Sequence, residues 1–341
     1  MKISIIKLTV ITALTLIFSQ IVAQKTSGYK MSKTFHIASL GGWDYIAVDE
    51  NSNRLYVSHG TQVNILDKTT GDSLGVILNT TGVHGIAFNQ SLGKGYTSNG
   101  RLNTVTVFDL KTAAVLSQIK TGENPDAIMY DEFSKKIITC NGRSKDLTII
   151  DPITETVVAT IPVGGKPETA VSDNNGKLYV NSEDKNEIVV VDMVKYTVLN
   201  HWTLAPGEEP TGLVIDLKTK RLFATCDKLL VAMDATNGKI IAQLPIGEGC
   251  DGAAFDPSTN LIFTSNGSAG TVTVVKEQNA NSFAVIETIT TKKSARTITI
   301  DTKSHHLYLP AADMEALAAD APKGTRPKMV AGSFQVLVLT K

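Results

Sequence analysis

The stretch "GYTSNGRLNTVTVFD" at residues 95–109 contains two short runs rich in Thr, Val and Tyr on either side of an Asn-Gly turn. It returns in altered form as "IITCNGRSKDLTIID" at residues 137–151 and as "IFTSNGSAGTVTVVK" at residues 262–276. Such runs around such a turn are typical of paired antiparallel strands. The chain therefore repeats a unit made of strands. The length of this repeat indicates which repeat architecture the chain adopts.

A second pattern gives the number of repeats. It consists of a polar residue, then alternating apolar positions, and usually a final Asp. It occurs as "DYIAVD" (44–49), "HGIAFN" (84–89), "DAIMYD" (126–131), "ETAVSD" (168–173), "TGLVID" (211–216), "DGAAFD" (251–256) and "RTITID" (296–301). The last residues of successive copies lie 40, 42, 42, 43, 40 and 45 positions apart. This period fits the four-stranded blade of a propeller, although two-helix repeats have a similar length.

The composition of the runs favours strands. Each copy is followed by a second run such as "RLYVS" or "KLYVN" and then by a third such as "VTVFD" or "IVVVD". Several of the third runs are apolar at nearly every position, as expected for strands buried on both faces. The sequence shows no sustained 3.6-residue period. We therefore predict an all-β, seven-bladed β-propeller with four-stranded blades.

The two ends of the chain predict how the ring closes. The seventh copy is one strand short when the sequence ends at Lys341, whereas "FHIASLGGWD" (35–44) aligns without a gap on "ATIPVGGKPE" (159–168), which is a fourth strand entering the next blade. We expect the N-terminal strand to complete the last blade, because this pairing removes an open sheet edge.

The first 23 residues predict export. They contain two lysines, an apolar run from Leu8 to Phe18 and a small residue, Ala23, at the expected cleavage site. The run is short for a membrane span, so a signal peptide is favoured over an uncleaved anchor. We expect residues 24–341 to form one periplasmic or secreted domain, monomeric and without an integral membrane segment.

Charge and cysteine content narrow the class of protein. The 33 basic and 33 acidic residues cancel, so no nucleic-acid partner is expected. Three cysteines are too few for a disulfide-built scaffold. A disulfide between Cys226 and Cys250 remains open, and Cys140 is expected to be a buried thiol.

Several stretches resemble the YVTN-repeat, YncE-like family of exported bacterial seven-bladed β-propellers. These are "DYIAVDENSNRLYVSHG", "KLYVNSEDKNEIVVVD", "IPVGGKPETAV" and "GEGCDGAAFDPSTNLIFTSNG". The resemblance covers most of the chain after residue 35 and implies the propeller fold. It implies no single function, because such propellers include binding proteins as well as lactonase-like and lyase-like enzymes.

Candidate functional residues occupy the first position of each inner strand, where the blades differ. These ring positions are Asp44, His84, Asp126, Glu168, Thr211, Asp251 and Arg296. All should lie at one end of the central channel, since the inner strands run in the same direction. The second-strand ends should approach the same polar funnel; they include His59, Asn99, Asn141, Ser182, Cys226 and Asn266.

The order around the ring predicts ion pairs and leaves two interpretations open. His84 falls between Asp44 and Asp126, and Arg296 falls between Asp251 and Asp44. These charges either satisfy one another structurally or form a ligand site. The candidate ligand-binding residues are Asp44, His59, His84, Asp126, Glu168, Asp251 and Arg296.

The same residues raise the question of a divalent metal, although the cofactor stays unknown. Asp44, His59 and His84 offer nitrogen and oxygen ligands for zinc, copper or manganese, whereas the carboxylates with Asn99 or Asn141 would suit calcium. No closely spaced metal-ligand motif supports either set.

A long loop at residues 311–332 of the last blade should emerge on the funnel face. We expect a short helix in "DMEALAADAP", starting at Asp313 and stopping at Pro322. Positive charge from Lys323, Arg326 and Lys328 would then lie near the acidic funnel. The loop is either a lid over a ligand or a plug in the channel.

Two functions follow from these patterns. The first is an exported binding or interaction protein that holds a small molecule or a protein partner at the channel mouth. The alternative is a metal-assisted lactonase-like hydrolase or lyase at the same place, with His84 or His59 as general base. No catalytic residue is assigned, and motifs for nucleotide or dinucleotide binding are absent from the sequence.

Overall fold

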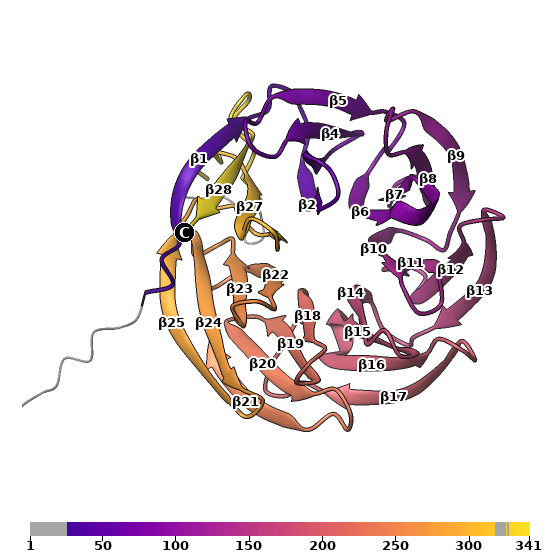
Figure 1. The fold of residues 1–341 in the computed structure, drawn as a ribbon, viewed down its shortest axis with the longest axis vertical. Coiled ribbons are helices and arrows are strands. Elements are labelled where there is room, and N and C mark those ends of the chain that lie inside the picture. The colour runs from indigo at the N-terminus through magenta and orange to yellow at the C-terminus, as the bar shows by residue number, and fades with distance from the viewer. Residues whose placement is uncertain (1–25, 318–324, 326) are drawn as a thin grey trace, which may run out of the picture.

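The computed structural model describes residues 26–317, 325 and 327–341, so the whole of the predicted signal peptide, residues 1–23, lies outside the described residues. In these ranges seven four-stranded antiparallel sheets surround a central channel (Figure 1). The inner strands line the middle of the ring and the fourth strands form its perimeter. The predicted all-β, seven-bladed propeller is confirmed.

Blades 1 to 4 follow one another along the chain, each running from the inner strand outward. Their strands are β2 (Trp43–Asp49), β3 (Arg54–His59), β4 (Gln62–Asp67) and β5 (Ser73–Ile77); β6 (Val83–Asn89), β7 (Lys94–Asn99), β8 (Thr104–Asp109) and β9 (Val115–Lys120); β10 (Pro125–Asp131), β11 (Lys136–Asn141), β12 (Asp146–Asp151) and β13 (Thr156–Pro162); β14 (Pro167–Ser172), β15 (Lys177–Ser182), β16 (Glu187–Asp192) and β17 (Thr197–Thr203). Two short 3₁₀ turns, η1 (Gln90–Leu92) and η2 (Glu183–Lys185), lie in blades 2 and 4.

Blades 5 to 7 complete the ring. Their strands are β18 (Leu213–Asp216), β19 (Arg221–Cys226), β20 (Leu229–Asp234) and β21 (Ile240–Pro245); β22 (Cys250–Asp256), β23 (Leu261–Asn266), β24 (Thr271–Asn279) and β25 (Ser282–Thr290); β26 (Thr299–Asp301), β27 (His306–Ala311), β28 (Gln335–Thr340) and β1 (Lys30–His36).

The hydrophobic core lies between neighbouring blades. One cluster joins Ile149 of β12 to Val180 of β15 in the next blade, and another joins Tyr308 of β27 to Leu55 of β3. The third strands are buried along their four central residues, as their continuous apolar runs predict. Each blade is therefore stabilised by two neighbours, which only a closed ring supplies to all seven.

The N-terminal strand closes that ring. β1 pairs antiparallel with β28, with Phe35 opposite Val336 and Lys30 opposite Thr340 (indigo beside yellow in Figure 1). Phe35 is only 4% exposed and packs in the cluster shared by blades 7 and 1. The predicted closure is confirmed, and the strand begins at Lys30, upstream of the aligned Phe35, because its pairing with β28 extends that far.

The repeated Thr-x-Asn stretch quoted above builds the interior of the blade. In blade 2 the Asn99 side chain accepts a hydrogen bond from Thr97 Oγ1 at 2.9 Å and donates one to Thr106 Oγ1 at 2.8 Å. Asn141 and Asn266 make the same two bonds in blades 3 and 6. Buried polar groups need such partners, so these asparagines are structural.

The expectation that the second-strand ends line a polar funnel is wrong. Their side chains are fully buried, with residue exposures of 0%; this holds for His59, Asn99, Asn141, Ser182, Cys226 and Asn266. The calcium set that includes Asn99 or Asn141 loses its basis, because both amides are occupied by threonine hydroxyls.

Candidate functional site

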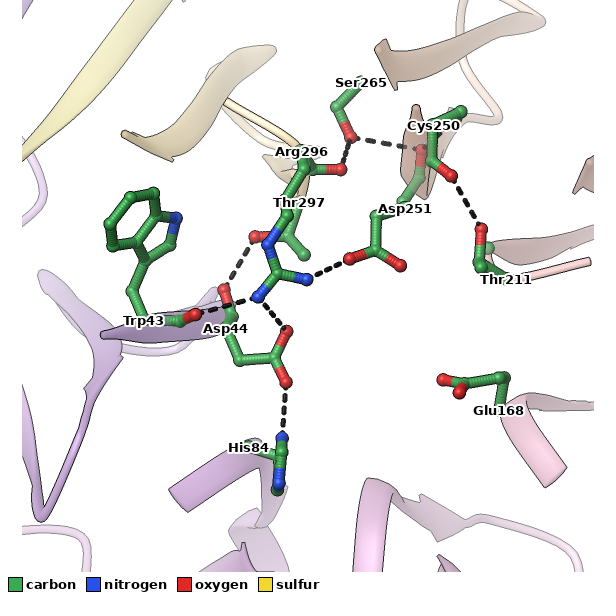
Figure 2. Close-up of polar contacts among 12 residues, drawn as sticks. Trp43, Asp44, His84, Glu168, Thr211, Cys250, Asp251, Ser265, Arg296 and Thr297 are labelled. Atoms are coloured by element: carbon green, nitrogen blue, oxygen red, sulfur yellow. Dashed lines mark hydrogen bonds and ion pairs between the residues drawn. The ribbon is translucent and has the colours of Figure 1, made fainter. Parts of the chain in front are cut away.

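Local irregularities aim the ring residues into the channel. In blades 1, 2, 3, 4 and 6 the pairing between the inner and second strands shifts register at the ring position, as between Trp43 and Ile46 in blade 1. A shift of this kind turns a side chain away from the regular pleat. Figure 2 shows Asp44, Glu168 and Asp251 directed toward a common central space from different strands.

The serine of the repeated stretch supports this irregularity. In blade 1 Ser58 Oγ accepts a hydrogen bond from Asp44 N at 3.0 Å and donates one to Tyr45 O at 2.8 Å. In blade 2 Ser98 Oγ accepts from Gly85 N at 2.8 Å. The serine thus satisfies backbone groups that the shifted pairing leaves free, and the repeat that builds the blade also positions the site.

Arg296 joins three blades on one side of the channel. Its Nη2 lies 3.2 Å from Asp44 Oδ1 and donates to the Trp43 carbonyl at 2.9 Å, while Nη1 pairs with Asp251 Oδ2 (Figure 2). Burial opposes its charge, but Asp44 and Asp251 outweigh burial and raise the pKa of the guanidinium. The structure therefore brings together the three residues that their order in the ring places side by side.

His84 joins the next two acids. Its Nδ1 lies 2.5 Å from Asp44 Oδ2 and 3.6 Å from Asp126 Oδ1. Burial disfavours the imidazolium, but the hydrogen bond to Asp44 and the charges of Asp126 and Asp44 raise the pKa of His84 above its ordinary value. The imidazole is therefore more readily protonated here than in water.

The far side of the channel carries two more acids. Burial, followed by the charge of Asp44, raises the pKa of Asp126 to about 7. Burial and the neighbouring Asp126 also raise the pKa of Glu168 above its usual range, although Lys166 Nζ lies 2.6 Å from Glu168 Oε1. We refer to Asp44, His84, Asp126, Glu168, Asp251 and Arg296 together as the charged ring.

Tyr45 is a functional candidate that sequence reasoning missed. Burial raises the pKa of its phenol well above the ordinary value, and the carboxylates of Asp126, Glu168, Asp44 and Asp251 add to this effect. The side chain is thus within electrostatic reach of acids from four blades. A signal was present, since the equivalent position in the other blades holds only small residues: Gly85, Ala127, Thr169, Gly212, Gly252 and Thr297.

Tyr45 also lines a small cavity next to the charged ring. The cavity has a volume of about 140 Å³, and its other walls include Ile46, Ile86, Ile128 and Met129. The walls are mainly apolar, in contrast to the charged ring. The phenol of Tyr45 therefore connects a charged surface to an apolar one.

His59 does not join the charged ring. Its Nδ1 lies 2.7 Å from Ser39 Oγ, its Nε2 lies 2.8 Å from the Gly41 carbonyl, and its ring stacks on Phe334 at 4.1 Å. Burial lowers the pKa of this imidazole. His59 takes the place in blade 1 that Asn99 holds in blade 2, so its role is structural, and it does not supply the ligand or general base suggested above.

The cysteines and the seventh ring position add no chemistry to the site. Cys140, Cys226 and Cys250 are free, buried thiols, and burial raises the pKa of each. The Cys226–Cys250 disulfide is absent from the structure described. Thr211 Oγ1 donates to the Cys250 carbonyl at 3.0 Å and so ties blade 5 to blade 6.

The long loop after β27 differs from its predicted form where it is described. Residues 313–317 contain no helix; instead Met314 forms an isolated bridge with Met329, and Glu315 N donates to Lys328 O at 2.7 Å. The predicted start of a helix at Asp313 is therefore wrong. The rest of the predicted helix, residues 318–322, lies outside the described residues, as do Lys323 and Arg326.

The base of this loop is tied to the segment that leads into Arg296. Ser294 Oγ donates to the Ala312 carbonyl at 2.8 Å, and Lys292 Nζ pairs with Asp313 Oδ1 at 2.6 Å. Phe334, at the other end of the loop, lies 5.3 Å from the Trp43 ring. The described ends of the loop thus approach the Arg296 side of the charged ring.

Comparisons with known proteins identify the fold but no family. Neither a protein-family model nor a curated protein matches the chain. Hydrazine synthase of Kuenenia stuttgartiensis is similar in structure, with a TM-score of 0.70 and 14% identity over 80% of this chain and 94% of that chain. The RRP9 WD40 repeats have a TM-score of 0.75 at 9% identity over 90% and 97% of the two chains, and U3-55K has 0.74 at 9% over 89% and 97%.

At these identities the similarity establishes the propeller alone, and the resemblance to YncE-like proteins stays a prediction. Within the described ranges, no helix combines the length and hydrophobicity that crossing a lipid bilayer requires.

Proposed function

We propose that this protein is an exported binding protein that holds a small polar ligand, or the polar group of a partner, at the charged end of its channel. The observation that carries the proposal is the convergence of six ionisable side chains from six blades on one space: Asp44, His84, Asp126, Glu168, Asp251 and Arg296. Propellers commonly serve as interaction scaffolds, and residues that differ among otherwise similar blades give each its specificity.

The uneven pairing within the charged ring supports a ligand over a purely structural network. Arg296 forms ion pairs with both Asp44 and Asp251, and Lys166 forms ion pairs with both Glu168 and Glu183. The carboxylate of Asp126, by contrast, accepts no hydrogen bond from any described residue; its nearest positive group is His84, at 3.6 Å. Buried polar groups normally have partners, so a ligand that supplies a donor or a positive charge fits this position.

Binding is favoured over the hydrolase or lyase alternative by the state of His84. A general base must be unprotonated at the working pH, whereas the two neighbouring aspartates raise the pKa of this imidazole. The named structural neighbours do not alter this choice, because one is an enzyme, hydrazine synthase, and another is a set of WD40 repeats. Export is supported by the apolar N-terminal segment.

Native mass spectrometry tests the proposal on protein purified from the culture fluid or periplasm without chelators. Glu168→Gln and Asp251→Asn change the charged ring while leaving Asp44, His84 and Asp126 intact. Glu132→Gln is the matched control, because Glu132 pairs with Lys135 on the surface and is 64% exposed.

We expect the wild type and the control to retain one small molecule, and each ring variant to lose about tenfold or more of that binding, as loss of one charged contact predicts. Equal retention by all four proteins would contradict the proposal. So would retention of nothing, together with no shift in Tm across a panel of small amines, amino acids and sugar acids.

A further inference from the structure

Three side chains of the charged ring converge more closely than the rest. Asp44, His84 and Asp126, on blades 1, 2 and 3, each place one donor atom within 4.8 Å of the other two. Across the described part of the chain, no other set of three or more His, Cys, Asp or Glu side chains meets this condition. The three come from successive inner strands, so their approach depends on the closed ring and not on sequence proximity.

The geometry points to a divalent metal site at Asp44, His84 and Asp126, with zinc or manganese as the ion. This inference rests on the proposed function and deepens it, because it names the ion through which an oxygen of the small polar ligand would be held. One imidazole nitrogen and two carboxylate oxygens form the mixed donor set that these ions accept. A bound ion would take the place of the proton on His84 Nδ1, because only the neutral imidazole coordinates a metal.

The distances suit a single ion with little rearrangement. Two tetrahedral ligands bonded at about 2.1 Å lie roughly 3.4 Å apart, and His84 Nδ1 is already 3.6 Å from Asp126 Oδ1. The pair of His84 Nδ1 and Asp44 Oδ2, at 2.5 Å, must open by about 1 Å. Side-chain rotation of Asp44 supplies that change while its other oxygen keeps Arg296.

Asp126 supplies an independent reason for a cation. Its side chain is only 13% exposed, yet among the described residues none donates a hydrogen bond to its carboxylate. Buried carboxylates are normally paired or coordinate metals, because burial without a partner is costly. An ion between Asp126 and Asp44 would neutralise both acids and give Asp126 a direct bond in addition to its long ion pair with His84.

The neighbouring positive side chains, Arg296 and Lys166, are paired with acids and do not neutralise Asp126. Arg296 Nη2 holds Asp44 Oδ1 at 3.2 Å, which leaves Oδ2 turned toward His84, and its Nη1 is engaged by Asp251 (Figure 2). Lys166 is engaged by Glu168 and Glu183. Arg296 therefore orients a metal ligand as its outer-shell partner. The remaining coordination positions are left for water or for an oxygen of a bound molecule.

Isothermal titration of the chelator-treated, full mature protein with Zn²⁺ alone and with Mn²⁺ alone tests this site. We expect one ion per chain, and a loss of affinity of about a hundredfold in His84→Ala and in the isosteric Asp126→Asn. His201→Ala is the matched control and should bind as the wild type does. His201 lies 2.8 Å from Glu187 on the exposed edge of blade 4, and within the described ranges it forms an ion pair with no second acid.

A spectroscopic measurement keeps the inference testable even if a variant fails to fold. Pulsed electron paramagnetic resonance of Mn²⁺ bound to the wild type should show coupling to an imidazole nitrogen, which His84→Ala removes. The inference is overturned if neither ion binds, if Mn²⁺ shows no nitrogen coupling, or if both ring variants bind as tightly as His201→Ala.

The two proposals fail separately. If neither ion binds but Glu168→Gln and Asp251→Asn still reduce ligand retention, the metal site is wrong and the binding function stands. If one ion binds through His84 and Asp126 but retention of a small molecule is the same in all variants, the metal site stands and the proposed ligand function is wrong.

Discussion

Single positions of the repeat determine whether a side chain builds the blade or faces the channel. Asn99, at the end of a second strand, is fully buried between Thr97 and Thr106. Asp126, at the start of an inner strand, instead faces acids from other blades. Substitutions at the two kinds of position should therefore affect different properties, namely stability in the first case and binding in the second.

Replacement of Asn99 by Ala should lower stability. The substitution leaves the hydroxyls of Thr97 and Thr106 without their amide partner in a buried place, which costs about 1–3 kcal/mol. Chemical denaturation followed by circular dichroism measures the change in the free energy of unfolding. The control is Asn175→Ala, at an exposed turn, which should change it by less than about 0.5 kcal/mol. Equal effects of the two substitutions would show that the buried amide is not structural.

Glu277 should make stability depend on pH. This side chain lies between blades 5 and 6, with Oε1 accepting from Thr219 Oγ1 at 2.8 Å, and it is 1% exposed. Burial, together with Asp216, raises its pKa from 4.5 to about 7. Between these values the folded protein holds a proton that the unfolded chain releases, so the free energy of unfolding falls as the pH rises.

In Glu277→Gln this part of the pH dependence should disappear. The difference in unfolding free energy between about pH 5 and about pH 8 should then shrink by an amount on the order of 2 kcal/mol. Urea denaturation of both proteins at the two pH values provides the measurement. An identical pH dependence in wild type and variant would mean that Glu277 ionises normally in the folded protein.

The sequence order of the ring positions predicted part of the site correctly. Arg296 does lie between Asp44 and Asp251, and His84 between Asp44 and Asp126, because neighbours in a ring are neighbours in the repeat order. Tyr45 was missed because it follows the ring position Asp44, and only the first position of each inner strand was predicted to face the channel. His59 was misplaced because strand direction gives the end at which a residue lies and not whether its side chain is buried.

At the scale of strands, β1 is the element on which closure depends. It is the outer strand of blade 7. Among the described strands it is the only one that lies at the N-terminal end of the chain while its sheet partners lie at the C-terminal end. The alignment with an internal fourth strand predicted this pairing because repeats of one fold share their register. Its first residues, from Lys30, lie upstream of the aligned segment and so were not predicted.

Phe35→Ala should therefore weaken the whole ring. Phe35 is 4% exposed and packs against the cluster shared by blades 7 and 1, and truncation of a buried Phe costs about 3–5 kcal/mol. Met31 provides the control on the same strand, since it is 42% exposed, and Met31→Ala should cost far less. Calorimetric Tm values measure both. Comparable losses at the two positions would argue that closure does not depend on this contact.

The loop after β27 shows where local sequence patterns fail. The Ala-rich stretch from Asp313 favours a helix by propensity, yet Met314 pairs with Met329 across the loop. A contact between residues so far apart in sequence outweighs local propensity and leaves no periodic pattern to detect. Ring closure and strand order, in contrast, follow from repetition that is visible in the sequence.

At the scale of the whole molecule, the closed ring is what makes a site out of residues that are separated along the chain. The charged ring draws one side chain from each of six blades, and Arg296 and Asp44 meet although 252 positions separate them. A chain of the same composition without closure would leave these charges apart. Binding at the channel mouth should therefore be lost whenever the ring opens.

Export of the protein is also a property of the whole chain and can be checked by mass. The apolar segment that ends near Ala23 predicts cleavage before Gln24. Intact-mass measurement on the protein recovered outside the cytoplasm should match residues 24–341. A mass that includes Met1, or recovery only from the cytoplasm, would argue against the signal peptide.

The most direct test of the site is a crystal structure of the protein purified from its own cells without chelators. We expect non-protein density at the channel mouth, within bonding distance of Asp126 and at least one further member of the charged ring. Density restricted to water there, with Asp126 paired to a protein donor, would show that the charged ring is a structural network and that ligands bind elsewhere.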